Sequence, residues 1–579
     1  MKKFYYLMMV FCVLLVACKP DTPVIPDPPV VDSDSVPGPD TIAPLTIVDS
    51  MSIWYPRHMY TVPSYTPLCV AMEKARKDMS EINIQAMFDR AEELVGKEEP
   101  YCMVATINGD PHSRMGFCWF TNDSIYDGVV QLIASEDATE AEFEAGAGVL
   151  TFEANANQTK ALRYTGICKH IVTASGLPKN EKIRYISHKA VATQLTPGTA
   201  YSWRCGYPGH WSEIAHFRTE DASQGEFSFI YMSDSHIMNP EYIQYARRCA
   251  LAAVNTVPEA RFCVFPGDFV EDGTVANSEW EWERWFEEAL KPVIMQMPIA
   301  PTDGNHDDSN NLNYTVHFNT DNEFNIMVTR KPQFEGIVYS FVYGDALFLV
   351  FSMQDFWRED YNYTDKTSVY LTDHISPWFR EQVRQHPNTK YRFSLAHFNL
   401  FSGSDHSTDE EPPLFRACML PTMKACEIDV ALQGHDHTYE VIGPVDPDSI
   451  KPIMSAITDR EVVPVDDNKN RTGYKGGTYR TDDGTLYFIG ATCGRKKYYP
   501  HSRERMERDY ENGKHDVPNY FDLFTGMFGQ PEAPSFTKIT VKDNCIEFNS
   551  YTADDDQGNV TLYNTMRVVR TRPHSIPLN

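Results

Sequence analysis

Residues 227–236 read FSFIYMSDSH, an apolar run followed at once by Asp234 and His236. The run has the length and the aromatic content of a buried strand. The same order, a short apolar run and then polar side chains, recurs four times further along the chain. The later polar groups are Gly267-Asp268, Gly304-Asn305-His306-Asp307, His397 and Gly434-His435-Asp436-His437. Since the ligands of α/β proteins gather at the carboxyl ends of strands, we expect these five groups to meet at one place.

The residue types in the five groups suit a pair of divalent metal ions. Carboxylates and imidazoles bind Mn, Zn and Fe(II) without choosing strongly among them. A carboxylate has two oxygens and can bridge two metals, while neutral imidazoles leave the site a net positive charge for a phosphate. Two metals about 3.5–4 Å apart are the usual apparatus for hydrolysing phosphate esters, because water bound to them loses a proton near neutral pH. The sequence therefore predicts a binuclear hydrolase of phosphate esters.

In this order and spacing, the five groups resemble the calcineurin-like metallophosphoesterase superfamily, whose pattern is D-x-H, G-D, G-N-H-D/E, H and G-H-x-H. The resemblance implies a two-sheet α/β/β/α sandwich and a metal-activated hydroxide that attacks phosphorus. The residues that would hold one metal are Asp234, His236, Asp268 and His437. The second metal would share the bridging Asp268 and would also take Asn305, His397 and His435.

The same resemblance implies roles for residues that do not bind metal. His306 would face the phosphate and stabilise developing charge or protonate the leaving oxygen. Glu271 stands three residues after Asp268, where relatives often carry an aspartate that orients this histidine, and the adjacent Asp272 is an alternative. Either carboxylate is equally well a solvated surface residue. His406 would be a second acid or an anchor for the phosphate, or else an ordinary loop histidine.

The chain more narrowly resembles the purple acid phosphatases and their bacterial relatives. The matching segments are LTPGTAYSWRCG at 195–206, WSEIAHFRTED at 211–221, GHDHTYE at 434–440, FIGATCGRKKYY at 488–499 and SFTKITVKDNCIEFNSYTAD at 535–554. The purple enzymes have D-x-G in the first group and a metal-binding tyrosine three residues after the bridging aspartate. Here His236 and Glu271 occupy those two positions. The missing phenolate predicts a colourless site with two divalent metals.

The pattern of the chain changes near residue 223. Residues 223–575 are expected to form the phosphoesterase domain, and residues 100–222 an all-β sandwich similar to fibronectin type III domains. The strands expected in that sandwich are 103–107, 115–121, 129–135, 191–195, 200–207 and 214–219. The aromatic residues expected in the core are Trp119, Trp203, Trp282, Trp285 and Phe286.

The amino terminus has the pattern of an exported lipoprotein. Two lysines precede an apolar run that is too short for a confident membrane helix and ends in LVAC, which resembles a bacterial lipobox. The resemblance implies that the signal, residues 1–18, is cut before Cys18 and that this cysteine carries a lipid. An ordinary export signal or a membrane anchor is the alternative. Residues 19–45 read as a Pro/Asp-rich linker and residues 46–99 as an N-terminal extension. We expect attachment to the outer membrane or the cell surface.

Composition restricts the choice of partners. The net charge of −28 argues against nucleic acid bound through a basic face, so a small phosphorylated substrate is expected. The scattered cysteines show no CxxC pair, and the sequence leaves open whether Cys418 pairs with Cys426. It also leaves the oligomeric state open.

Three functions are compatible with these features. An exported, tethered phosphatase would most simply hydrolyse small extracellular phosphomonoesters. Phosphodiester or nucleotide hydrolysis uses the same metal core, and the flanking loops decide between them. A surface binding protein with a vestigial site is the third possibility, although all seven metal-ligand positions carry suitable residues.

Overall fold

A computed structural model of the chain describes residues 98–575, apart from 123–124, 155–162, 165–184, 222, 224, 239, 272–277, 308–312, 321–335, 355–364, 410, 464–472 and 513–519. The predicted signal and linker, most of the predicted extension, and Asp272 lie outside the described residues. All the described residues belong to one compact unit, residues 47–579. Among the described helices, none is both long and apolar enough to cross a membrane.

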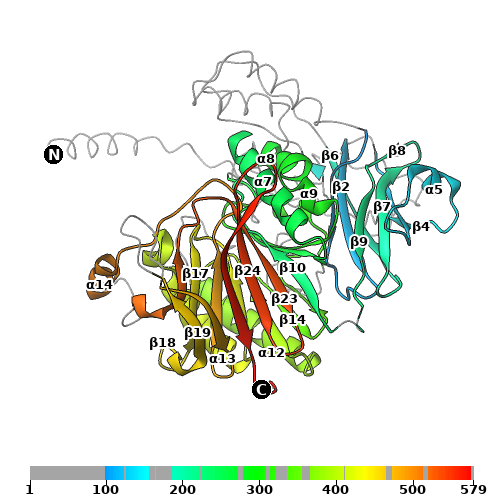
Figure 1. Ribbon diagram of the computed structural model, residues 1–579. Coiled ribbons are helices and arrows are strands. Elements are labelled where there is room, and N and C mark those ends of the chain that lie inside the picture. Colours follow the sequence, from blue (N-terminus) through cyan, green and yellow to red (C-terminus); the bar gives the residue numbers. More distant parts are fainter. Residues whose placement is uncertain are drawn as a thin grey trace, which may run out of the picture. The chain divides into compact units, whose positions relative to one another are not determined.

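A sheet of 12 strands runs through both predicted domains (Figure 1). Its order is β19-β20-β25-β24-β23-β10-β11-β12-β1-β2-β6-β5. In that order the strands are Ile457–Val462, Tyr474–Arg480, Val560–Val569, Ile546–Ala553, Ser535–Val541, Phe227–Tyr231, Cys263–Pro266, Ile299–Thr302, Tyr101–Thr106, Met115–Asn122, Tyr185–Ala192 and Arg163–Tyr164. The adjacent strands β10, β11 and β12 are parallel, and each residue in them is buried. Burial on both faces explains their continuous apolar sequence.

A second sheet has the order β13-β14-β15-β16-β21-β17-β18, with β22 paired to β17. In that order the strands are Tyr339–Tyr343, Ala346–Val350, Tyr391–Leu395, Val430–Gln433, Thr485–Gly490, Tyr439–Asp446, Lys451–Pro452 and, for β22, Phe524–Gly529. The two sheets pack face to face. The ring of Phe229 in β10 lies 5.4 Å from that of Phe348 in β14 and 5.8 Å from that of Phe393 in β15.

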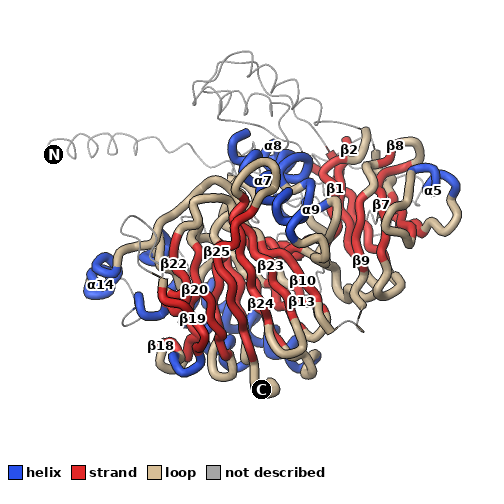
Figure 2. Tube along the Cα trace, in the orientation of Figure 1, coloured by secondary structure: helices blue, strands red, loops and turns tan. Residues whose placement is uncertain are grey.

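Helices cover the outer faces of this pair of sheets (Figure 2). Helix α7 (Pro240–Thr256) packs on β23 and β24, and α12 (Ser376–Gln385) packs on β14. The other helices are α5 (Glu140–Ala145), α8 (Ser278–Arg284), α9 (Lys291–Ile294), α10 (Asn313–His317), α11 (Asp365–Val369), α13 (Glu411–Ala425) and α14 (Arg503–Glu511). Short π and 3-10 helices are η1 (Trp285–Ala289), η4 (Tyr370–Ile375), η5 (Asp405–Thr408), η6 (Met454–Ala456) and η7 (Tyr520–Leu523). The layers follow the expected order helix, sheet, sheet, helix.

The amino-terminal strands do not close a sandwich of their own. A third sheet, β4-β3-β7-β8 with β9 on β7, consists of Leu150–Glu153, Val129–Ile133, Ala200–Tyr207, His210–Trp211 and Ala215–Arg218. It packs on β2, where the ring of Phe117 lies 4.8 Å from that of Trp203. The strands β1, β2 and β6, however, continue the large sheet, because β1 is buried throughout and pairs with both β2 and β12. The fibronectin type III-like prediction is therefore not confirmed.

The predictions about the core are confirmed. Trp119, Trp203, Trp282 and Trp285 are fully buried, and Phe286 is 1% exposed. The expected strand at 191–195 differs, since β6 covers Tyr185–Ala192 instead. Cys418 and Cys426 are free thiols, like every other cysteine in the described part of the chain.

The carboxylate of Asp429 connects the second sheet to the carboxyl-terminal segment. Asp429 is fully buried and accepts hydrogen bonds from the backbone N–H of Arg392, from Thr481 Oγ1 and from His574 Nε2. Its Oδ1 also lies 3.2 Å from Nη1 of Arg570, whose side chain is 4% exposed. The pair is therefore a buried ion pair with further hydrogen bonds.

We predict that Asp429→Ala lowers the free energy of unfolding by about 3–5 kcal/mol, because it leaves buried charge without its partner. Chemical denaturation followed by circular dichroism measures this. Asp448→Ala is the control, because its carboxylate is 72% exposed and pairs with Lys424 at the surface. Equal stability of the two variants would contradict the prediction.

Candidate metal centre

The five polar groups meet at the carboxyl ends of strands from both sheets. Strands β10, β11 and β12 of the large sheet lead into Asp234, Asp268 and Asn305, respectively. Strands β15 and β16 of the second sheet lead into His397 and His435. Because strands are parallel within each set, their ends lie at the same edge.

The loops that carry these side chains have unusual backbone conformations. Asp234, His236, Asp268 and His435 have φ values of 57°, 47°, 53° and 70°, in the left-handed region. Non-glycine residues there carry strain that the surrounding structure must offset. The neighbouring Gly304 also has no room for a side chain, since a Cβ would lie 2.2 Å from the backbone nitrogen of Asp268. A residue with a side chain at Gly304 would therefore push the Asp268 loop out of place.

Asp307, the last residue of the third group, holds two of these loops together. Its Oδ2 accepts hydrogen bonds from the backbone N–H groups of Asp268, at 2.8 Å, and Gly304, at 2.7 Å. Its Oδ1 accepts from the backbone N–H of Phe269 at 2.8 Å. The fully buried carboxylate thus positions Asp268.

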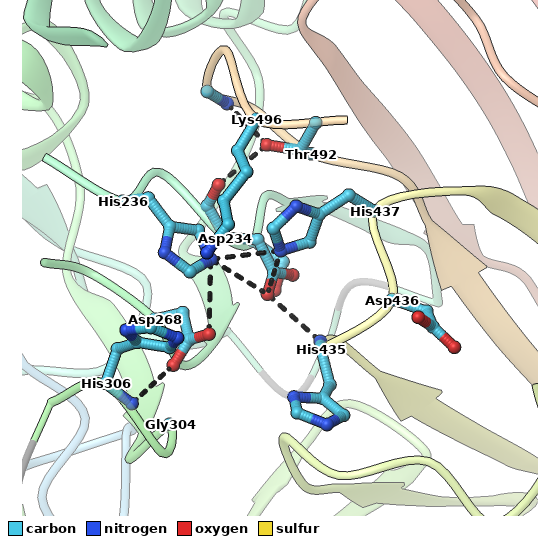
Figure 3. Close-up of polar contacts among 12 residues, drawn as sticks. Asp234, His236, Asp268, Gly304, His306, His435, Asp436, His437, Thr492 and Lys496 are labelled. Atoms are coloured by element: carbon cyan, nitrogen blue, oxygen red, sulfur yellow. Dashed lines mark hydrogen bonds and ion pairs between the residues drawn. The ribbon is translucent and has the colours of Figure 1, made fainter. Parts of the chain in front are cut away.

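One cluster consists of Asp234, His236, Asp268 and His437, which Figure 3 shows turned toward one another. Nε2 of His236 lies 3.0 Å from Nε2 of His437 and 3.2 Å from Oδ2 of Asp268. Oδ1 of Asp234 lies 3.5 Å from Nε2 of His437. These are the four residues predicted for the first metal.

A second cluster shares Asp268 and adds His397 and His435. Nε2 of His397 lies 3.3 Å from Oδ2 of Asp268, 2.9 Å from Oδ1 of Asn305 and 3.2 Å from Nδ1 of His435. The structure therefore brings together all seven predicted ligands. Asp268 lies where a bridging carboxylate is expected.

The donor set fits two divalent cations. Oδ2 of Asp234 and Nδ1 of His437 are buried without a hydrogen-bond partner among the described residues. Burial lowers the pKa of His437 to about 4, which favours the neutral imidazole that binds metal. Although burial opposes it, Asp268 raises the pKa of His236 to about 9 and that of His397 to about 10. The carboxylates thus attract positive charge to the places where cations are expected.

His306 and Glu271 lie on the His236 side of the centre. The ring centroids of His306 and His236 are 4.8 Å apart, and the backbone N–H of His306 donates to Oδ1 of Asp268. Nδ1 of His306 donates to the main-chain oxygen of Glu271, at 2.5 Å. The Glu271 carboxylate instead accepts a hydrogen bond from Nδ1 of His236, at 2.6 Å. The structure therefore places this carboxylate on His236, a predicted metal ligand, and not on His306 as the resemblance implied.

His406 lies on the other side, on the 3-10 helix η5. Its ring stacks on that of His435, with the centroids 3.8 Å apart, and its Nδ1 donates to Oδ2 of Asp409 at 2.7 Å. His306 and His406, the two histidines that were not predicted to bind metal, therefore flank different clusters.

Sequence reasoning missed two residues of the loop after β21. Nζ of Lys496 lies 3.2 Å from Oε1 of Glu271. The ring of Tyr498 stacks on that of His437, with the centroids 4.3 Å apart. Both residues belong to FIGATCGRKKYY, a segment whose sequence indicated only a resemblance to the purple acid phosphatases. The glycine and paired lysines after the strand were the available signal.

Two family models match the chain. The model for calcineurin-like phosphoesterases matches residues 227–439, and the model for the purple acid phosphatase N-terminal domain matches residues 100–219. Among curated proteins, acid phosphatase type 7 of Danio rerio is 23% identical over 284 residues. The match covers 46% of this chain and only 59% of the length of that relative.

Among solved structures, purple acid phosphatase PPD1 from yellow lupin (Lupinus luteus) seeds is similar, with a TM-score of 0.54 and 13% identity. The match covers 82% of this chain and 74% of the lupin chain. The structure of PhoD aligns over 82% of this chain and 93% of its own, with a TM-score of 0.48 and 11% identity. The lupin structure shows that the fold is shared.

We predict that Asp307→Asn lowers the free energy of unfolding by about 2–4 kcal/mol and reduces the bound metal. The asparagine amide would place an N–H donor against backbone N–H groups that now donate to the two oxygens of the carboxylate. Denaturation and elemental analysis measure the two effects.

The matched control is Asp555→Asn, because the partly exposed Asp555 accepts the backbone N–H groups of Gln557 and Asn559 in a surface turn. We expect this variant to keep its metal. An Asp307→Asn protein with unchanged stability and metal content would show that the hydrogen bonds of the Asp307 carboxylate are not needed to position Asp268.

Proposed function

We propose, from the premise that this chain is a calcineurin-like phosphoesterase with a purple acid phosphatase N-terminal domain, that it hydrolyses phosphate monoesters outside the cytoplasm with two divalent metal ions. The observation that carries the proposal is Asp268, whose Oδ2 lies within 3.3 Å of histidines from two clusters. A carboxylate shared in this way suits a pair of metals better than a single ion.

Different residues of the chain would hold the two metal ions. Asp234, His236, Asp268 and His437 would hold one ion, and Asn305, His397 and His435 would complete the other site with Asp268. Two bound divalent ions supply Lewis acidity toward the phosphoryl oxygens and activate water near neutral pH. The remaining groups would then have to orient the ester and to protonate its leaving oxygen.

His306 is suited to act on the leaving oxygen. Its Nδ1 is engaged by the main-chain oxygen of Glu271, which fixes the ring and leaves Nε2 for the ester. A proton held at Nε2 would pass to the leaving oxygen as the ester bond breaks. His406, held by Asp409 beside His435, would anchor a phosphate oxygen from the opposite side.

A phosphomonoester is favoured over a diester by the cationic groups around the two clusters. Lys496 contacts Glu271 beside His236, and His406, whose pKa Asp409 raises although burial opposes it, stacks on the ring of His435. A monoester carries more negative charge than a diester and gains more from these groups. Phosphodiester or nucleotide hydrolysis is the alternative for the same centre.

We predict that the purified chain binds two divalent metals and hydrolyses p-nitrophenyl phosphate, and that Asp268→Asn lowers this rate at least about 1,000-fold, in the range of losing one essential charge-stabilising group. Elemental analysis and steady-state kinetics measure both properties. The matched control is Asp448→Asn, the same change at a surface aspartate whose carboxylate is 72% exposed.

Turnover of different phosphate esters by the same purified protein distinguishes the two candidate activities. Faster turnover of p-nitrophenyl phosphate than of bis-p-nitrophenyl phosphate and nucleotides would support the monoesterase. The reverse order would favour the diesterase. A chain that binds no metal would overturn the proposal that it is a metal-dependent hydrolase.

The proposed location rests on the first residues of the sequence. The LVAC segment supports a lipid on Cys18 and attachment to the outer membrane or cell surface. The residue after it, Lys19, is unlike the aspartate that retains some lipoproteins in the inner membrane. We therefore propose that the enzyme acts on small extracellular esters.

We predict that Cys18→Ser moves the protein from the detergent phase to the aqueous phase in a Triton X-114 partition, because the lipid is lost. Cys12→Ser is the matched control, since that cysteine would leave with the signal. An equal distribution of both variants and wild type would refute the lipid anchor.

A further inference from the structure

The two positions at which this chain departs from the purple pattern, His236 and Glu271, are in direct contact. Nδ1 of His236 donates to Oε2 of Glu271 at 2.6 Å. A carboxylate can only accept, so Nδ1 carries a proton, and Nε2, which faces Asp268 and His437, is the nitrogen that a metal would bind in place of a second proton. Metal-binding histidines usually donate their other N–H to a carboxylate, which fixes the tautomer and raises the basicity of the ligand.

Lys496 holds this carboxylate from its other side. Its Nζ lies 3.2 Å from Oε1 and 3.3 Å from Oε2 of Glu271, and both side chains are 23% exposed. Figure 3 shows the Lys496 side chain extending from the loop after β21 toward His236. Partial burial makes this ion pair stronger and better ordered than a surface pair.

The loop that carries Lys496 is attached to the first metal-binding segment. Thr492 Oγ1 donates to the main-chain oxygen of Asp234 at 2.6 Å, and the backbone N–H of Cys493 donates to that of Ser233 at 2.8 Å. At Gly494 a Cβ would lie 2.4 Å from the main-chain oxygen of Ser235. This close attachment brings Lys496 to Glu271 in a defined position.

The side chain of Glu271 is not needed for His306, because the main-chain oxygen of the same residue already accepts from Nδ1 of that histidine. The carboxylate is thus available for a separate role. We propose that Glu271 and Lys496 are positioning residues that act as one unit to hold His236 in the tautomer that binds metal. This inference rests on the proposed function, since it concerns one of the two metal sites.

The test is a Co²⁺ titration of the full-length chain after treatment with a chelator, followed by visible absorption. We expect wild type to bind two Co²⁺ ions. Glu271→Ala should weaken one of them by about 10- to 100-fold and leave the other unchanged. Glu271→Gln should recover part of the loss, because its amide oxygen still accepts the Nδ1 proton.

A double-mutant cycle tests whether the two residues act together. Lys496→Met should change the affinity of the same site by at least about threefold when Glu271 is present and have no effect in the Glu271→Ala background. The matched control is Lys497→Met, because this neighbour on the same loop contacts Glu532 instead. Circular dichroism confirms that each variant is folded.

Three results would overturn the inference. Glu271→Ala that binds both ions with wild-type affinity would show that the carboxylate does not support His236. Equal effects of Lys496→Met with and without Glu271 would show that the two residues act separately. A wild-type chain that binds no Co²⁺ would overturn the proposed function as well, and so is distinguishable from the other two.

Discussion

The position of the Asp268 carboxylate is the constraint on which the rest of the site depends. Its Oδ2 lies between His236, which follows a strand of the large sheet, and His397, which follows a strand of the second sheet. The oxygen can occupy this place only if each set of parallel strands is in register and the two sheets pack face to face. The aromatic contacts of Phe229 maintain that packing. The strained backbone at Asp268 is offset locally by the hydrogen bonds to Asp307.

The amino-terminal β part is joined to this arrangement by backbone pairing. Strand β1 pairs in parallel with β12, and the backbone N–H of Ile107 donates to the main-chain oxygen of Ile299 at 3.0 Å. Since β12 leads into Asn305 and His306, the β part supports the strand that carries two residues of the centre. Its contribution is structural, because it extends the sheet that positions the ligands.

The chain departs from the purple pattern at two positions whose side chains are in contact. A phenolate is an anionic ligand, whereas an imidazole binds metal in its neutral form, and the Glu271 carboxylate supplies negative charge one hydrogen bond away from His236. The ammonium group of Lys496 partly neutralises the Glu271 carboxylate. The resulting donors are imidazole and carboxylate, which is consistent with two divalent ions. Replacing Glu271 alone would leave Nδ1 of the buried His236 without its acceptor.

The sequence by itself predicted the buried strands, the polar groups that follow them and the aromatic core, because strands and the turns after them are encoded locally, and the family resemblance supplied the two-sheet fold. Tertiary structure alone decided how the amino-terminal strands pair and which atom each side chain meets. Local patterns predict that β1 is a buried strand but not that it pairs with β12. Glu271 and Lys496 are separated by 225 residues, so their contact depends on packing between two loops. The partner of Glu271 was therefore beyond prediction, since a one-residue motif does not specify which of two nearby imidazoles its carboxylate will face.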